Sequence, residues 1–451
     1  MSKVLVVTLD TLAERMAGPA IRAWEIASYL AASHDVELVT FGRCERAAEG
    51  FLARRTTVEA FRDDVARADV VVLQGYVMRT FPWMQSCPQT IVVDLYDPFH
   101  LESLEVERGK DLVQRNGALD NALSELEIQA LRGDLFLCAS EKQRDLWLGH
   151  LAAHGRVNPA TYDADPSLRS LVTVVPFGIS SEPPARSGAA IKGVVPGIGR
   201  DDRVVVWGGG VYNWFDPFTV IRAIDRVKET VPDVRLFFMG MKHPNPDVPE
   251  TQAARRARAL ADELALTGRH VFFNEDWVPY ERRADYLLDA DVGVSAHFDH
   301  IETAFSFRTR ILDYLWSSLP VVCTDGDAFG DLVTAEGLGR AVPAEDVDAL
   351  ASALEELLTD GDLRAEARRN VEVVAERFRW PAVLAPLGEA CEHPRRAADA
   401  ADLDRRLRRR HRSRLTLLQR VRLDTLAVWR HLREGGPSAV AAKVRWRLSR
   451  R

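Results

Sequence analysis

Short apolar runs alternate with helical stretches along most of this chain. The runs are typical of strands that are buried on both faces of a parallel sheet. The predicted strands cover residues 4–8, 36–40, 69–73, 90–94, 135–139, 171–175, 203–207, 234–239, 271–273, 292–295 and 319–323. Between them, apolar residues recur with the 3.6-residue period of a helix, as in Ala23, Ile26, Ala27 and Leu30. This alternation predicts an α/β fold with parallel sheets.

The stretch 291–322 carries the strongest candidate chemistry. A helix expected to begin near Ser306 has an apolar stripe and an opposite polar side, made respectively of Ile311, Leu312, Leu315 and Trp316, and of Ser306, Arg310, Asp313 and Ser317. Arg308 and Arg310 fall in its first turn, where the helix dipole is already positive, so a bound anion would offset their repulsion. Asp313 could accept hydrogen bonds from a diol. The pattern suggests a diphosphate and a ribose; the alternative is an ordinary βαβ unit with a solvated polar face.

Residues 308–322, RTRILDYLWSSLPVV, resemble the nucleotide-binding helix of GT-B glycosyltransferases, in particular the retaining enzymes of family 4. The resemblance implies two Rossmann-like domains that face each other across a cleft. It also implies sugar transfer, with retention, from a nucleotide sugar to a hydroxyl acceptor, without a cofactor or bound metal. A carboxylate at the place of Asp313 binds the ribose in that family. The family's first Glu would fall on Phe305, so Glu302 is the candidate replacement near the donor sugar.

Two glycine loops also resemble the family. Residues 17–31, AGPAIRAWEIASYLA, resemble its first loop, in which Gly18 would face the donor phosphates and the acceptor; a tight turn explains Gly18 equally well. Gly209 and Gly210 belong to three successive glycines after the strand 203–207, where the backbone can approach a phosphate or sugar closely.

The phosphate clamp departs from the family pattern. Family members carry an Arg and a Lys just beyond the strand 203–207, and this chain has neither. Arg308, Arg310 and Lys242 are therefore the candidate substitutes. Trp277 follows the strand 271–273, where the family contacts the base; it could line the base pocket, although packing at the sheet edge is favoured.

The loop after the strand 90–94 lies where ligands of doubly wound sheets bind, outside the carboxyl ends of the strands. His100 in this loop could bind the donor sugar or the acceptor, and a helix-capping or surface histidine is the alternative. Asp94 and Asp97 raise the question of a divalent-metal site. No further ligands stand at metal-like spacing, and we predict no metal.

The resemblance and the composition together divide the chain into four parts. We predict an acceptor domain at 1–182, a sugar-nucleotide domain at 183–380, a helix crossing back at 381–392 and a basic tail at 393–451. The Pro-, Gly- and Ser-rich residues 180–202 read as the interdomain linker. Five scattered cysteines without a C-x-x-C motif favour reduced thiols in a cytoplasmic protein.

The charge is strongly asymmetric. The net charge of the chain is −7, but residues 404–451 alone carry 16 Lys and Arg against 3 Asp and Glu. Within this basic tail, Leu417, Leu418, Val421, Val428, Trp429 and Leu432 fall on one helical face. This pattern favours an interfacial helix on the anionic inner face of the cell membrane, with a simply solvated tail as the alternative. No nucleic-acid partner is expected, because no recognition motif accompanies the charge.

Two other functions stay open at this point. An epimerase of the GT-B fold would also bind a sugar nucleotide. A catalytically silent sugar-nucleotide-binding protein is the second alternative, because Phe305 replaces the family's first Glu and the Arg and Lys after the strand 203–207 are missing.

The tail makes a direct prediction. Truncation after Leu403 should leave the remaining chain folded but abolish binding to anionic vesicles, and added salt should weaken binding of the intact chain because it screens the basic residues. Vesicle sedimentation of both proteins measures this. Equal binding of the truncated and intact chains would exclude a membrane role for the tail.

Overall fold

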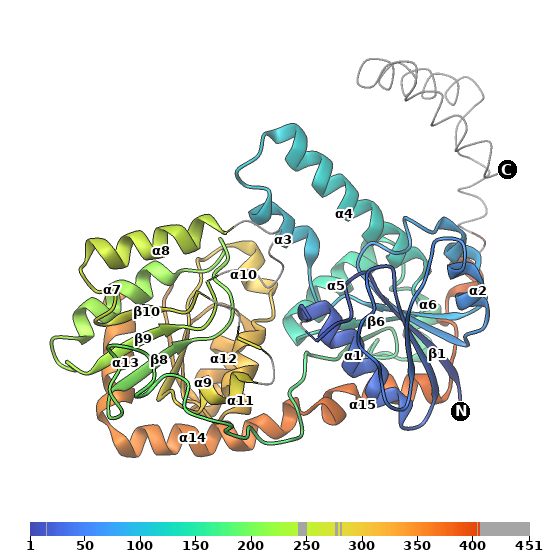
Figure 1. Ribbon diagram of the computed structural model, residues 1–451. Coiled ribbons are helices and arrows are strands. Elements are labelled where there is room, and N and C mark those ends of the chain that lie inside the picture. The colour runs from blue at the N-terminus through green and yellow to red at the C-terminus, as the bar shows by residue number, and fades with distance from the viewer. Residues whose placement is uncertain (15, 242–249, 276–277, 280–281, 404, 406–451) are drawn as a thin grey trace, which may run out of the picture. The chain divides into compact units, whose positions relative to one another are not determined.

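The computed structural model describes residues 1–14, 16–241, 250–275, 278–279, 282–403 and 405 (Figure 1). By their contacts, residues 1–399 and 400–451 form two units. Lys242, Trp277 and nearly all of the basic tail lie outside the described residues. The predictions made for them therefore stay predictions, as do the domain boundaries at 182, 380 and 392.

The first half of the chain forms a seven-stranded parallel sheet in the order β3-β2-β1-β4-β5-β6-β7. Its strands are β1 (Lys3–Thr8), β2 (Asp35–Thr40), β3 (Leu52–Arg55), β4 (Val70–Gln74), β5 (Thr90–Asp94), β6 (Leu135–Cys138) and β7 (Val172–Val174). The order reverses between β1 and β4, and so defines a topological switch point.

The helices of this half are α1 (Gly18–Ala31), α2 (Phe61–Ala66), η1 (Pro82–Ser86), α3 (Phe99–Val106), α4 (Leu112–Arg132), α5 (Glu141–Ala153) and α6 (Pro159–Ala164). The amphipathic residues between β5 and β6 form two separate helices, α3 and α4. The break has a local cause, since the side chain of Asp111 caps α4 by accepting hydrogen bonds from the N–H groups of Val113 and Gln114.

The second half repeats the design with a six-stranded parallel sheet in the order β10-β9-β8-β11-β12-β13. Its strands are β8 (Arg203–Trp207), β9 (Val234–Phe238), β10 (Val271–Phe273), β11 (Val292–Ser295), β12 (Val321–Thr324) and β13 (Gly339–Val342). Here the order reverses between β8 and β11. The predicted α/β fold with two parallel, Rossmann-like sheets is thus confirmed.

The helices of the second half are α7 (Pro217–Val227), α8 (Gln252–Glu263), α9 (Arg283–Leu287), α10 (Ile301–Phe305), α11 (Thr309–Trp316), α12 (Ala328–Glu336), α13 (Val347–Thr359), α14 (Gly361–Ala375) and η3 (Glu376–Phe378). They cover both faces of the sheet (Figure 1). Alternate residues of β8 therefore pack into two different hydrophobic clusters, one on each face. Val205 packs with α7, α8 and α13, whereas Val204 and Val206 pack with α11, α12 and α14.

The last long helix, α15 (Trp380–Glu392), packs against α1 of the first half. The hydroxyl of Ser2, just before β1, donates a 2.6 Å hydrogen bond to the carbonyl of Cys391. A Cβ on Gly388 would lie 3.0 Å from the hydroxyl of Tyr29 on α1, so the small residue permits the close packing. This is the contact expected of a helix that crosses back to the first half.

Two features were not predicted from the sequence. The edge strands β3 and β13 were missed because their apolar patterns are short and interrupted by Arg54, Arg55 and Arg340. The helix expected to begin near Ser306 begins at Thr309, because the separate short helix α10 ends at Phe305 and Ser306 has an extended backbone.

One buried ion pair joins three segments of the first half. Arg22 on α1 donates two hydrogen bonds, of 2.6 and 2.9 Å, to the carboxylate of Asp94 at the end of β5. Its guanidinium also donates to the carbonyls of Val175 and Pro176, after β7. Both charged side chains are almost fully buried. The carboxylate of Asp94 is therefore already occupied by an arginine and does not contribute to a metal site.

Loss of this carboxylate should be costly. Asp94→Ala should lower the free energy of unfolding by about 3–5 kcal/mol, because it leaves the Arg22 guanidinium buried without a counter-charge. The matched control is Glu45→Ala, which removes an exposed partner of Arg43 and should leave stability nearly unchanged. Denaturant unfolding of the two variants tests the prediction. A similar, small loss in both would show that the buried pair does not stabilise the fold.

Candidate functional site: a cavity at the carboxyl ends of both sheets

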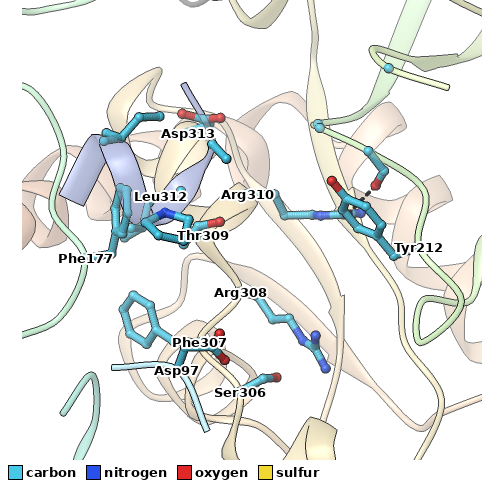
Figure 2. Close-up of a pocket in the computed structure, with 18 of the residues that line it drawn as sticks. Asp97, Phe177, Tyr212, Ser306, Phe307, Arg308, Thr309, Arg310, Leu312 and Asp313 are labelled. Carbon is cyan, nitrogen blue, oxygen red and sulfur yellow. Dashed lines mark hydrogen bonds between the residues drawn. The ribbon is translucent and has the colours of Figure 1, made fainter. Parts of the chain in front are cut away.

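A cavity of about 540 Å³ is lined by loops that follow strands of both sheets (Figure 2). The first half contributes the beginning of α1, the loop after β5 and the segment after β7. The second half contributes the glycines after β8 and the segment from α10 to α11. The segments after β1, β8 and β11 lie at the two topological switch points, where ligands of doubly wound sheets bind.

A single tyrosine fixes the helix that carries most of the predicted donor site. The hydroxyl of Tyr314, on α11, accepts a 2.8 Å hydrogen bond from the N–H of Gly208 and donates one of 2.8 Å to the carbonyl of Val294. It thereby joins α11 to the ends of β8 and β11. The side chain is fully buried, and burial raises its pKa to about 12. A Cβ on Gly293 would lie 2.5 Å from its ring, so only glycine leaves room for it.

The glycines of the cavity wall differ in whether backbone conformation or lack of space favours a glycine at their positions. Gly209 has a φ of +72°, a left-handed conformation that favours glycine. A Cβ on Gly210 would lie 3.1 Å from the ring of Tyr212. Gly18 is the first residue of α1, and a Cβ there would meet no atom within 4 Å. Gly18 lines the cavity, its predicted contact with the donor phosphates stays a prediction, and no neighbouring atom of the described protein requires it to be glycine.

Arg310 is a buried cation that is only partly satisfied. One guanidinium nitrogen, Nη2, donates a 2.8 Å hydrogen bond to the carbonyl of Gly210, and Figure 2 shows the side chain extended toward this loop. The guanidinium lies 3.9 Å from the ring centre of Phe215 and 4.3 Å from that of Trp207. A second guanidinium nitrogen, Nη1, is buried and makes no hydrogen bond within the described residues. Burial lowers the pKa of Arg310 to about 10, so an anion in the cavity would stabilise its charge.

Arg308 is held differently, by Glu302. Its guanidinium donates hydrogen bonds of 3.0 and 3.3 Å to the two carboxylate oxygens of Glu302, and one of 3.1 Å to the hydroxyl of Thr303. Both charged side chains are at least 95% buried and line the cavity. The structure therefore brings Glu302 into the predicted site. Its observed contacts make it a positioning partner of Arg308, and its predicted role near a donor sugar stays untested.

Asp313 reaches the cavity from the first turns of α11 (Figure 2). The sequence left open whether it pairs with Arg310, three residues earlier. The Arg310 guanidinium instead turns toward Gly210, and the cation that pairs with Asp313 among the described residues is Arg283, whose Nε lies 3.5 Å from the carboxylate. Loss of hydration raises the pKa of Asp313, and Arg283 and Arg310 oppose that rise. Asp313 is about 31% exposed, which leaves its carboxylate accessible to a ligand.

A carboxyl pair faces the cavity from the first half. Asp97 follows β5, and Glu102 lies in the first turn of α3. The carboxyl group of Asp97 donates a hydrogen bond to that of Glu102. Burial raises the pKa of Asp97 well above its usual value, the negative charges of Glu102 and Glu302 add to that rise, and Arg308 opposes it. The pair therefore retains a proton at a pH where isolated carboxyl groups are ionised.

His100 is not among the residues that line the cavity. It lies on α3 with its ring centre 5.6 Å from that of Trp147, and burial lowers its pKa to about 4. The structure thus gives no contact through which it would touch a ligand in the cavity. Within the described residues, no group of three His, Cys, Asp or Glu side chains could hold a metal ion. No described helix is long and apolar enough to cross a membrane.

Several cavity residues were not singled out from the sequence. Tyr314, Arg283, Glu102 and Tyr212 contact or line the site. For Tyr314 a signal existed, since Gly293 inside a strand indicates the close approach of another group. Arg283 and Glu102 gave no local signal, because only the tertiary fold brings them to the cavity.

The two halves, each with a parallel sheet and loops that meet at one cavity, define the GT-B fold of glycosyltransferases. Residues 202–360 match the family described as "Glycosyl transferases group 1". Sucrose-phosphate synthase of Thermosynechococcus elongatus superposes with a TM-score of 0.60 at 16% identity, over 87% of this chain and 98% of its own. HepE of Anabaena, solved with UDP and glucose, gives a TM-score of 0.60 at 12% identity, over 87% of this chain and all of its own. The predicted GT-B resemblance is confirmed.

A relative in sequence is the phosphatidyl-myo-inositol mannosyltransferase of Mycolicibacterium smegmatis. The two are 26% identical over 168 residues, which are 37% of this chain and 39% of the relative. The match thus spans less than half of either protein.

The carboxyl pair generates a prediction about pH. Because the pKa of Asp97 is raised in the folded protein, wild-type stability should fall as the pH rises from about 3.9, the usual value, toward the folded pKa, and stay low above it. Asp97→Asn is neutral throughout and can still donate to Glu102. It should therefore be more stable than the wild type at pH 8, with a smaller advantage at pH 5. Unfolding curves at both pH values measure this.

The control for this experiment is Asp120→Asn, which changes an exposed aspartate on α4. It should track the wild type at both pH values. A constant offset between Asp97→Asn and the wild type across the pH range would contradict a raised pKa of Asp97.

Proposed function

We propose that this protein is a retaining glycosyltransferase that moves a sugar from a nucleotide-sugar donor to a hydroxyl acceptor. The observation that carries the proposal is the buried guanidinium of Arg310, which lines the cavity with Nη1 unsatisfied by the described residues. A buried cation of this kind is stabilised by an anion, and a diphosphate supplies one. The GT-B fold and the match at 202–360 support the transferase class. Retention rests on the resemblance to family 4.

The donor would be held mainly by the second half. Asp313, one turn after Arg310, has a partly exposed carboxylate that can accept hydrogen bonds from the two ribose hydroxyls. The backbone at Gly209 and Gly210 leaves room for the phosphates close to Arg310. HepE is solved with UDP and glucose, which supports a nucleoside diphosphate sugar as the donor class.

Sugar transfer requires a positive charge near the phosphate oxygens of the leaving group. Breaking the bond between the sugar and the diphosphate builds negative charge on the phosphate oxygens, and a cation in a dry site stabilises that charge strongly. Arg310 is preorganised for this role by Gly210 and the two rings beneath it, so little reorganisation is needed during the reaction. Arg308 is neutralised in part by Glu302, and it would contribute less.

Two alternative functions would use the same cavity but predict a different result when the donor is supplied. A GT-B epimerase would convert the donor without an acceptor, so incubation of the donor alone and analysis for an epimer separates it. A silent sugar-nucleotide-binding protein would bind nucleotides without turnover or hydrolysis of any donor. Its support is the occupation of Glu302 by Arg308 and of the family's first Glu position by Phe305. Binding of the nucleoside diphosphate, followed by donor turnover with an acceptor panel, tests the proposal.

The proposal also covers the class of acceptor and the place in the cell where the protein acts. The basic tail favours work at an anionic membrane surface, with a lipid-linked or polysaccharide acceptor. The mannosyltransferase of Mycolicibacterium smegmatis is named for a phosphatidyl-inositol, which supports a membrane-linked acceptor class.

The ribose role of Asp313 makes the sharpest prediction here. Asp313→Ala should weaken binding of the best nucleoside diphosphate about tenfold or more, because a charge-assisted hydrogen bond is worth roughly 1.5–3 kcal/mol. The melting temperature should change little, since the side chain is partly exposed and does not fill the core. Calorimetric titration beside melting curves measures both quantities.

The control is Asp331→Ala, which removes an exposed aspartate on α12 outside the cavity and should not change nucleotide affinity. Equal affinity of Asp313→Ala and the wild type would remove the ribose role and weaken the whole proposal.

A further inference from the structure

The described cations of the cavity wall come from one half of the protein, where the carboxylates of Glu302 and Asp313 accompany them. Within the described part of the chain, the cationic side chains that line the cavity are Arg283, Arg308 and Arg310, all from the second half. The ionisable side chains from the first half are Tyr96, Asp97 and Glu102. A donor diphosphate held at Arg310 would therefore leave the carboxyl-lined wall for the other substrate.

The Asp97–Glu102 pair is built to bind neutral or positively charged groups. Asp97 keeps its proton and donates a hydrogen bond to Glu102, so the remaining lone pairs of the two groups can accept hydrogen bonds from hydroxyl or ammonium groups. Among the described residues, the ionisable groups near the pair include Glu302, Arg308 and Tyr212 from the second half, and Tyr76 and Tyr96 from the first half. Arg308 already binds Glu302, so little positive charge is free to balance a second anion.

Two rings from the same half complete this wall. Tyr96 and Phe177 line the cavity with their ring centres 6.5 Å apart, and Figure 2 shows Phe177 at its border. Aromatic faces beside carboxyl groups suit the alternating C–H and O–H surface of a sugar ring or polyol. The wall therefore combines apolar faces with hydrogen-bond acceptors, and its described residues include no cationic side chain.

We propose that the Asp97–Glu102 pair binds the acceptor, and that the acceptor end which enters the cavity is a neutral or cationic sugar or polyol and not a sugar phosphate. This inference rests on the proposed glycosyltransferase function. A phosphate at this wall would lie against Asp97, Glu102 and Glu302. The beginning of α1 at Gly18 also lines the cavity, and its free N–H groups favour an anion, so phosphorylated sugars are the decisive comparison.

The experiment uses the full chain saturated with the nucleoside diphosphate that binds most tightly. Mannose, myo-inositol, glucosamine, glucose 6-phosphate and mannose 6-phosphate are titrated separately, with binding followed by saturation-transfer NMR. At least one neutral or cationic compound should bind about tenfold or more tightly than its phosphorylated counterparts. The double variant Asp97→Asn, Glu102→Gln should narrow this ratio and weaken neutral-sugar binding, with nucleoside diphosphate affinity unchanged.

The control is Glu107→Gln. The Glu107 carboxylate, just after the last residue of α3, pairs with Lys110 and does not line the cavity. This variant should behave as the wild type in every titration. Tighter or equal binding of the sugar phosphates, or no binding of any neutral or cationic compound, would overturn the inference. A wild type that binds no nucleoside diphosphate would instead overturn the proposed function, so the two failures are distinct.

Discussion

The hydroxyl of Tyr314 is the contact on which the second half of the site depends. It bonds to the backbone of both strands that flank the switch point, β8 through Gly208 and β11 through Val294. Together with the buried stripe of Ile311, Leu312 and Leu315, this contact fixes α11 and so the positions of Arg310, one turn before Tyr314, and of the adjacent Asp313. Arg310 is set against the glycines after β8, and Asp313 is set at the cavity wall.

The positions of the buried charges follow from this anchor. Burial of an arginine costs free energy unless other groups replace its hydration. The carboxylate of Glu302 stabilises the buried charge of Arg308, whereas one carbonyl and two aromatic rings stabilise that of Arg310. The two arginines look equivalent in the sequence, but a carboxylate neutralises the guanidinium of Arg308 and none pairs with that of Arg310 among the described residues. This difference explains why an anionic ligand suits the cavity beside Arg310, and why the acidic wall of the first half suits a different kind of group.

Much of the fold could be predicted because it depends on local patterns. Continuous apolar runs predict buried parallel strands, and β5, β8, β10 and β11 begin and end at the predicted residues. The chemistry of the site was less accessible, because it depends on contacts between distant residues. Arg308 and Glu302 were both chosen as candidates, but the sequence does not show that they bind each other. His100 was chosen for its place after a strand, and the fold directs its ring toward Trp147.

The proposed function requires that the cavity beside Arg310 binds a nucleoside diphosphate. The most direct measurement is a crystal structure of the protein with the nucleoside diphosphate that binds most tightly. We expect a phosphate oxygen about 3 Å from Nη1 of Arg310, and the ribose hydroxyls hydrogen-bonded to the carboxylate of Asp313. A nucleotide bound elsewhere, or a diphosphate that leaves Nη1 of Arg310 without a partner, would contradict it.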